Sequence, residues 1–168
     1  MFGRGLDIVI QPSKPYYVLG EDLTFTAVVK SNKNANFKSV KAYLRCVEEA
    51  EIEVEEFDEE DFETTTERVS HVHWDQEIFL ANAGTLYANY PLTLQGVFRI
   101  PPNAPPTYAG RISRVKWILG VKVDRGFLKS KTSEVNLSIY RSAQVAQASQ
   151  PLFAEQNFNE AITRVYLN

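Results

Sequence analysis

The sequence of 168 residues has one cysteine, Cys46, and two histidines. A single cysteine cannot form an internal disulfide, which favours a reducing compartment. The longest apolar runs are only a few residues, as at residues 117–121, whereas a membrane-spanning helix needs about 20. The N-terminal apolar run is interrupted by Asp7, which is not typical of a secretory signal. We therefore expect a cytoplasmic protein with no transmembrane helix.

Sequence motifs of catalysis are also absent. There is no Gly-x-Ser-x-Gly nucleophile elbow, no phosphate-binding glycine loop and no His-Glu-x-x-His zinc motif. Cys46 alternates onto the apolar side of its segment, which is typical of a small core residue rather than a nucleophile. The many carboxylates gather in one acid-rich stretch, which does not indicate a shaped catalytic cleft. We expect a non-enzymatic protein that needs no cofactor.

What the sequence does have is a repeated alternation of apolar and polar residues, which is typical of half-buried β-strands. Turn-forming residues separate the alternating segments, and no amphipathic helix lies between them. Strands joined by turns predict an all-β fold of two antiparallel sheets packed face to face, an immunoglobulin-like β-sandwich, over residues 1–141. The seven strongest segments are residues 6–11, 22–30, 40–47, 68–80, 92–100, 115–123 and 135–139.

Residues 142–168 depart from this pattern. They begin with a small, polar stretch that is typical of a linker, and they continue into a C-terminal tail. Asn157 and Glu160 have the spacing of a helix capping box, whereas residues 162–167 also fit a strand. The sequence leaves both alternatives open for the tail.

Charge is distributed unevenly along the chain. The formal net charge is −3, yet residues 48–63 contain eleven carboxylates and no basic residue. Because so many like charges cannot be buried together, we expect an exposed, extended acidic loop over residues 48–67. Two aromatic side chains among the acids would add apolar contact area for a basic partner. The candidate partner-binding residues are Glu55, Glu56, Phe57, Asp58, Glu59, Glu60, Asp61 and Phe62.

Two other interpretations of the acidic stretch compete with partner binding. The first is a hairpin tip that only keeps the protein soluble. The second is calcium binding, but the stretch contains no glycine and lacks the alternating aspartate spacing of a calcium-binding loop. We therefore expect no calcium site in it.

The rest of the chain carries a formal charge of +8. If Val115 and Trp117 face the core, then Arg114, Lys116 and Lys122 share the outer face of one strand. This basic face is a candidate surface for an acidic protein, for an anionic membrane or for the chain's own acidic loop; the alternative is an ordinary solvated sheet face. Nucleic-acid binding is not expected, because the face lacks interleaved aromatic residues and the acidic loop would repel phosphates.

His71 and His73 lie two residues apart on a predicted strand and therefore point the same way. A His-x-His pair can chelate zinc, but residues along one straight strand cannot surround an ion without a ligand from a neighbouring strand. The two histidines are weak metal candidates, and a polar outer face of the strand is the favoured alternative. We expect no metal site.

Four motifs follow one another along the chain. They are PYYVLGEDL at residues 15–23, FRIPP at 98–102, the corner PPTYAG at 105–110, and the long strand VKWILGVKV at 115–123 followed by DRG. Through the last three motifs, the segment from residue 86 to 140 resembles the amino-terminal domain of the arrestin family, and it is most similar to the α-arrestin branch. The similarity extends over residues 6–141, because the upstream motif also fits in the same order.

The resemblance implies a β-sandwich that serves as an adaptor in trafficking or signalling, with the loop after the 40–47 strand contacting partners. Recognition of phosphorylated receptors is not implied, because Gln11 and Lys14 stand where receptor-binding arrestins have paired lysines. The PPTY sequence at residues 105–108 matches a ligand of WW domains, but it falls at the family's structural corner, so we expect a structural role. The retromer's arrestin-fold subunit and the bacterial sporulation-control proteins share this fold.

Together these observations predict a non-enzymatic adaptor domain. It would bind protein partners, such as membrane-protein tails or basic segments, through its sheet edges and the acidic loop, with the basic face meeting an anionic membrane. The alternative is a structural module that assembles with a second sandwich. That second sandwich would belong to another copy in a homodimer, or to the other half of a two-domain protein like an arrestin or the retromer subunit.

Overall fold

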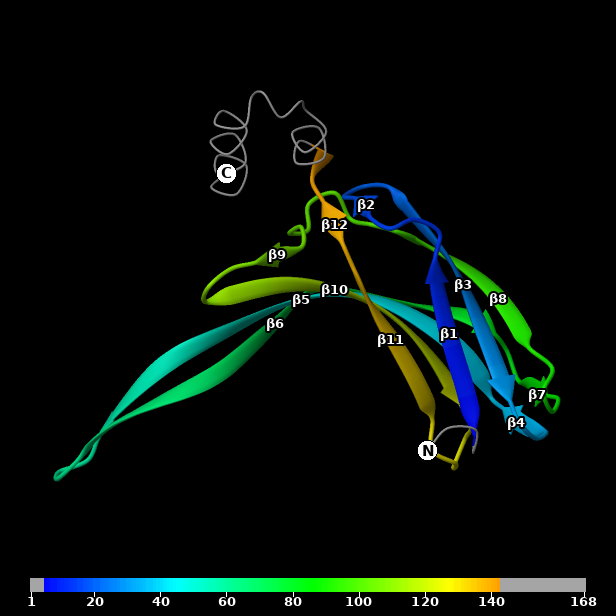
Figure 1. Ribbon diagram of the computed structural model, residues 1–168, viewed down its shortest axis with the longest axis horizontal. Helices are drawn as coiled ribbons and strands as arrows, with labels where there is room; N and C mark the ends of the chain where they lie inside the picture. Colours follow the sequence, from blue (N-terminus) through cyan, green and yellow to red (C-terminus); the bar gives the residue numbers. More distant parts are fainter. Residues whose placement is uncertain (1–4, 143–168) are drawn as a thin grey trace.

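The computed structural model describes residues 5–142, and every secondary-structure element in this part is a β-strand (Figure 1). In the same residues there is no helix long and apolar enough to cross a membrane. The strands are β1 (Leu6–Pro12), β2 (Tyr17–Val18), β3 (Asp22–Ser31), β4 (Ala35–Phe37), β5 (Ser39–Phe57), β6 (Phe62–Ala81), β7 (Gly84–Leu86), β8 (Leu92–Arg99), β9 (Tyr108–Ala109), β10 (Ser113–Asp124), β11 (Lys131–Leu137) and β12 (Ile139–Tyr140).

Two antiparallel sheets form the body of the molecule. The first has the strand order β1-β3-β8, and the second has the order β11-β10-β5-β6 with β9 paired to β10. Two short pairs accompany them: β12 and β2 run parallel, and β4 and β7 run antiparallel. The predicted all-β fold of antiparallel sheets is confirmed.

The core lies between the two sheets, because alternation along each strand directs every second side chain inward. The longest such series is on β10, where Val115, Trp117 and Leu119 are buried. The β5–β10 register sets Trp117 opposite Cys46 and Leu119 opposite Leu44. All seven predicted segments lie in strands, apart from residues 100 and 138.

The corner at residues 105–110 is tied into this core by hydrogen bonds. The indole Nε1 of Trp117 donates to the carbonyl oxygen of Pro105 at 2.9 Å. The backbone N–H of Thr107 donates to the carbonyl of Ile139 at 2.7 Å, and Pro106 is buried. A WW domain needs an exposed polyproline segment, so the PPTY sequence serves this fold as a structural corner.

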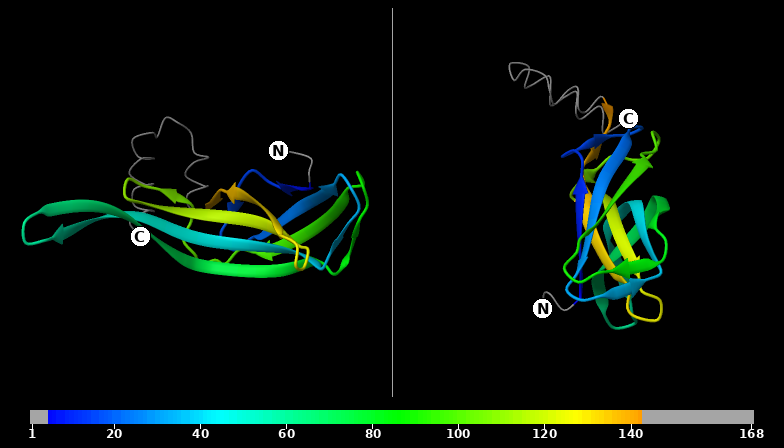
Figure 2. Two further views of the ribbon diagram at one scale, coloured as in Figure 1. Left: turned by 90° about the horizontal axis from the view of Figure 1, so that it is seen from below. Right: turned by 90° about the vertical axis from the view of Figure 1, so that its right-hand side faces the viewer.

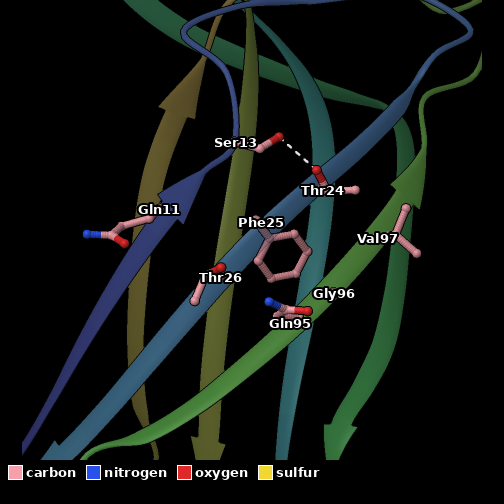
Figure 3. Close-up of a pocket in the computed structure, with 8 residues that line it drawn as sticks. All are labelled: Gln11, Ser13, Thr24, Phe25, Thr26, Gln95, Gly96 and Val97. Carbon is pink, nitrogen blue, oxygen red and sulfur yellow. Dashed lines mark hydrogen bonds between the residues drawn. The ribbon is translucent and has the colours of Figure 1, made fainter.

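Gly96 sits where two layers approach closely. It lies opposite Phe25 in the β3–β8 register, and the Phe25 ring is buried beside it. Figure 3 shows both residues among polar side chains that line an open depression of about 490 Å³. A Cβ atom at position 96 would lie 2.5 Å from Cζ of Phe25 and 2.9 Å from Cδ2 of Leu80. Glycine is therefore the residue that this position accommodates.

Replacing Gly96 by alanine should lower the free energy of unfolding by about 1–3 kcal/mol, because the Phe25 ring must shift within a packed core. The matched control is Gly5→Ala, since a Cβ there meets nothing within 4 Å. Urea denaturation measures the free energy of unfolding of each variant. Comparing the two variants cancels the effect that a glycine-to-alanine change has on the unfolded chain. Equal stabilities of the two variants would contradict this account.

The predicted acidic loop over residues 48–67 is wrong in its form. Residues 48–57 continue strand β5 and residues 62–67 belong to strand β6, so only residues 58–61 form a turn. The turn is closed by reciprocal backbone hydrogen bonds between Asp58 and Asp61. Strand β10 stops pairing with β5 at Ala50. Beyond that point β5 and β6 pair only with each other and form a two-stranded ribbon, residues 51–68, which we call the arm. Figures 1 and 2 show the arm projecting from the sandwich.

The prediction of a loop was wrong because like charges disfavour burial but do not disfavour an exposed strand. Successive side chains of a strand point to opposite faces, so carboxylates on one face are about 7 Å apart. Screening by water and salt weakens their repulsion at that distance. The opposite strand supplies three β-branched residues, Thr64 to Thr66, which favour extended backbone. The predicted linker and tail, residues 142–168, lie outside the described residues except for residue 142.

Candidate functional site

The two faces of the arm differ in chemistry. On one face Glu51 pairs with Arg68 at 3.2 Å, Glu53 and Glu55 stand opposite threonines, and the two phenylalanines meet at the end. The other face continues the core side of the sheet; its register pairs are Ala50 with Val69, Ile52 with Glu67, and Val54 with Thr65. The arm therefore presents an acidic face and a partly apolar face.

The tip of the arm gathers the candidate partner-binding residues. Phe57 and Phe62 are opposite each other in the register, and their rings are 5.1 Å apart in an edge-to-face arrangement. Their side chains remain 79% and 57% exposed. Exposed carboxylates surround the pair on both strands and in the turn, namely Glu55, Glu56, Asp58, Glu59, Glu60, Asp61 and Glu63. The structure thus places an exposed aromatic pair within a dense acidic surface.

The base of the arm meets the predicted basic face directly. Arg114 and Lys116 point to the outer side of β10, and both reach the carboxylate of Glu49, at 3.6 and 3.2 Å. Lys122 shares this face but lies further along the strand, opposite Lys41. The three cations therefore share a face as predicted, yet they are not one free basic surface.

The acidic tip does not reach the basic face. Glu49 at the base of the arm neutralises Arg114 and Lys116, whereas residues 55–63 extend away from the sandwich (Figure 1). Of the predicted acidic loop, residues 48–67, Glu49 therefore does pair with the basic face, whereas the tip of the arm does not take part in these ion pairs. A two-stranded ribbon holds its tip at a distance that a flexible loop would not.

The remainder of this outer face is a network of opposite charges. Lys41 pairs with Glu77 at 3.5 Å, and Arg45 pairs with Asp75 at 3.6 Å. Between them, the hydroxyl of Tyr43 donates to the carboxylate of Glu134. Burial and the neighbouring Glu134 raise the pKa of Tyr43 above its usual range. Alternating signs on one face make it an ordinary solvated surface rather than a docking site for one charge.

The two histidines lie at an irregularity in β6. The register shifts between Cys46 and Val47, so that His73 is the extra residue of a β-bulge. Its Nε2 is 2.8 Å from Oε1 of Glu48, and its ring packs edge-on against His71. Glu48, on strand β5, is thus the side chain from a neighbouring strand that a metal site at the histidines would need. Within residues 5–142, however, no three side chains of metal-ligating type are grouped so that they could hold one ion.

Cys46 is buried at the centre of the second sheet. Its thiol contacts the carbonyl of Pro105 at 3.8 Å. Burial, together with the nearby Glu48, raises the pKa of Cys46 to about 12. Cys46 is fully buried, so it is a core side chain, as the alternation predicted.

The turn between β10 and β11 contains an exposed apolar pair that sequence reasoning missed. Phe127 is 100% exposed and Leu128 is 53% exposed. The turn is held by hydrogen bonds: Gly126 N–H donates to Asp124 Oδ1 at 2.9 Å, and Arg125 Nε donates to the Lys129 carbonyl at 3.0 Å. The available signal was two apolar residues between basic ones in a segment with turn chemistry.

Comparison with known proteins identifies the fold but no family. No family model matches the sequence, and no curated protein matches it. Among solved structures, the chain is similar to Spo0M, a sporulation control protein from Bacillus subtilis, with a TM-score of 0.60 at 13% sequence identity. The match covers 91% of this chain and 55% of the Spo0M chain. Since sporulation-control proteins share the arrestin fold, the predicted arrestin-like sandwich is confirmed.

Proposed function

We propose that this chain is a non-enzymatic adaptor domain that binds protein partners through its arm. The observation that carries the proposal is the exposed Phe57–Phe62 pair set among carboxylates at the end of a long ribbon. When a partner covers an aromatic side chain that is solvated in the free protein, the burial of its apolar area stabilises the complex. The motifs at residues 98–126 further support a place near the α-arrestin branch, and with it a role in trafficking or signalling.

The chemistry of the arm defines the partner that it fits. Carboxylates on both strands favour a basic partner, such as the basic segment of a membrane-protein tail, and they raise its association rate at low salt. The aromatic pair requires an apolar pocket or groove between the partner's cations. The free edges of β5 and β6 along the arm also offer unpaired backbone groups to an added strand.

The test is quantitative partner capture from cell extract with the full chain on a support. Changing Phe57 and Phe62 to serine should reduce recovery of the specific partner about 30-fold or more, because a central aromatic pair contributes about 2 kcal/mol or more. Replacing the tip carboxylates by amides should also reduce recovery and remove its dependence on salt. The control is Val9→Ser with Val97→Ser, two side chains that are half exposed on the other sheet.

Recovery of the same partners in the same amounts by all four proteins would refute the proposal. In that case the arm only keeps the protein soluble. The variants should fold normally, because every altered side chain is at least half exposed or lies on the arm, outside the core.

A second candidate function is assembly with another sandwich. The chain spans about half the length of Spo0M, since the match covers 55% of that protein. This observation favours a homodimer, or one half of a two-domain protein, as the working unit. Sedimentation of the chain with and without residues 142–168 tests the homodimer: the intact chain should sediment as a dimer and the shortened chain as a monomer. A monomer in both cases would refute it.

A further inference from the structure

The molecule has a second charged end, opposite the arm. Strand β5 begins at Ser39, which pairs with Asp124 at the β10–β11 turn, and it ends at Phe57 in the arm. A strand of 19 residues is about 60 Å long at about 3.3 Å per residue. The turn at residues 125–130 and the acidic tip therefore lie at opposite ends of one strand, as Figure 2 shows.

Loops from distant parts of the sequence meet at this end. The N–H of Lys38 donates to the carbonyl of Asp124 at 2.7 Å, and the N–H of Asn89 donates to the carbonyl of Ser31 at 2.7 Å. Strand β4 pairs with β7 beside them. Basic residues from these segments make up what we call the basic end: Lys30, Lys33, Lys38, Lys122, Arg125, Lys129 and Lys131.

The cations of the basic end are available for a ligand. Within the part of the chain that the structure describes, none of the seven forms an ion pair, in contrast to Arg114 and Lys116 on the sheet face. Negative groups are nearby but engaged: Asp124 accepts from Gly126, and Glu77 pairs with Lys41. Asp7 stands opposite Lys30 in the β1–β3 register. The end is therefore predominantly positive.

Apolar side chains project from the same end. Phe127 is fully exposed and Leu128 is half exposed in the β10–β11 turn, and Tyr87 and Tyr90 are exposed beside β7. A fully solvated phenylalanine between two basic residues has nothing in the sandwich to pack against. Aromatic residues are enriched where protein meets the lipid headgroup region, and lysine and arginine extend their ammonium or guanidinium groups toward lipid phosphates.

We propose that the basic end is a docking surface for an anionic lipid bilayer, with Phe127 and Leu128 entering the headgroup region. Each lysine or arginine within a Debye length of such a bilayer contributes about 1 kcal/mol of attraction. An inserted aromatic and an inserted leucine add burial of apolar area, and two weak signals together give stable binding where one does not. The surface is basic and carries exposed apolar side chains at one turn, which suits an anionic bilayer.

The acidic arm fixes the orientation of the bound molecule. An anionic bilayer repels the carboxylates of the tip only when the tip comes within about a Debye length, so orientations that bring the arm to the bilayer are disfavoured. When the basic end is bound, the tip is about 60 Å away along β5, many Debye lengths at physiological salt, and is not repelled. The chain would stand with the arm directed away from the bilayer. This inference does not depend on the arm's proposed partner, because different residues carry the two proposals.

The experiment is vesicle flotation of the full chain. Vesicles of equal parts phosphatidylcholine and phosphatidylserine should carry the protein, and vesicles of phosphatidylcholine alone should carry about tenfold less or lower. Phe127→Ser with Leu128→Ser should weaken binding to the anionic vesicles about 150-fold or more, since burial of each of the two side chains contributes roughly 1.5 kcal/mol or more. Lys129→Gln with Lys131→Gln should weaken it about 30-fold, at about 1 kcal/mol for each of the two charges, and lower its salt dependence.

Two matched control variants show whether vesicle binding depends on the basic end rather than on the sheet face or the arm. Arg114→Gln with Lys116→Gln removes the same charge from the sheet face, and Phe57→Ser with Phe62→Ser removes two exposed aromatics from the arm; both should bind the anionic vesicles like the unmodified chain. Thermal unfolding followed by circular dichroism checks that each variant is folded. Equal binding by the turn variants and the unmodified chain, equal binding to both kinds of vesicle, or a loss confined to the sheet-face variant would each overturn the proposal.

Discussion

Replacing Trp117 by alanine is expected to lower the free energy of unfolding by about 3–5 kcal/mol. Trp117 is 0% exposed and lies at the centre of β10, between β5 and β11. Truncation removes contacts with the opposite sheet and leaves a cavity that rigid β-strands cannot close. It also deprives the Pro105 carbonyl of its indole donor. A typical domain is stable by about 5–15 kcal/mol, so this single change should make the fold marginal.

Urea denaturation followed by tryptophan fluorescence and circular dichroism measures the effect. Trp117→Phe should cost less, about 1–3 kcal/mol, because it restores most of the volume but leaves the carbonyl without its strong donor. The matched control is Trp74→Ala: the Trp74 ring lies tilted against the Trp117 ring, with 6.1 Å between ring centroids, but Trp74 remains partly exposed. A loss at Trp74 equal to or larger than the loss at Trp117 would contradict the proposed core.

The body of the sandwich could be predicted from the sequence because its strands are half buried. A buried face forces alternation, and alternation is local, so Val115, Trp117 and Leu119 reveal the strand and its inner face without knowledge of any partner. The same pattern assigned Cys46 to the core. These inferences needed only the period of two and a chain long enough to bury the inner faces.

The arm could not be predicted because its strands bury almost nothing. Residues 51–54 do alternate glutamate with Ile52 and Val54, but without a buried face this strand pattern is short, and the eleven carboxylates of residues 48–63 favour an exposed loop over a strand. What fixes the ribbon is pairing with residues 62–68 and continuity with β5, which the sandwich already holds in place. Both are tertiary effects, so a strand-by-strand interpretation stopped near Val47.

The distribution of free and paired cations was also beyond the sequence. Arg114 and Lys116 share a face by simple alternation, but their neutralisation by Glu49 depends on the β5–β10 register. The basic end is assembled from loops that are far apart in the chain, of which only the 125–131 stretch was visible as basic residues near a strand end. The bulge at His73 likewise depends on a register shift between β5 and β6. Long-range register, rather than local pattern, decides which charges remain for a partner.

Cys46 is expected to react with a thiol reagent such as dithionitrobenzoate about 1,000-fold more slowly in the folded chain than in the denatured chain. Burial raises the pKa of the thiol to about 12, from an ordinary value of 9.0. At a pH near 8 the reactive thiolate is therefore about 1,000-fold scarcer in the folded protein. Because Cys46 lies opposite Trp117 and contacts the same Pro105 carbonyl, Trp117→Ala should speed the reaction by opening the core.

The same shift predicts how the fold responds to alkali. The folded pKa of Cys46 lies above its unfolded value, so burial of the neutral thiol contributes stability that is complete below about pH 9. That contribution falls as the pH rises from about 9 to 12, by about 1.4 kcal/mol per pH unit at most. Cys46→Ala lacks this group, while Tyr43 and all other titrating groups are common to both chains. Denaturation at stepwise pH should therefore show a steeper alkaline loss for the unmodified chain than for Cys46→Ala; parallel curves, or rapid labelling of the folded chain, would show that Cys46 is not buried as described.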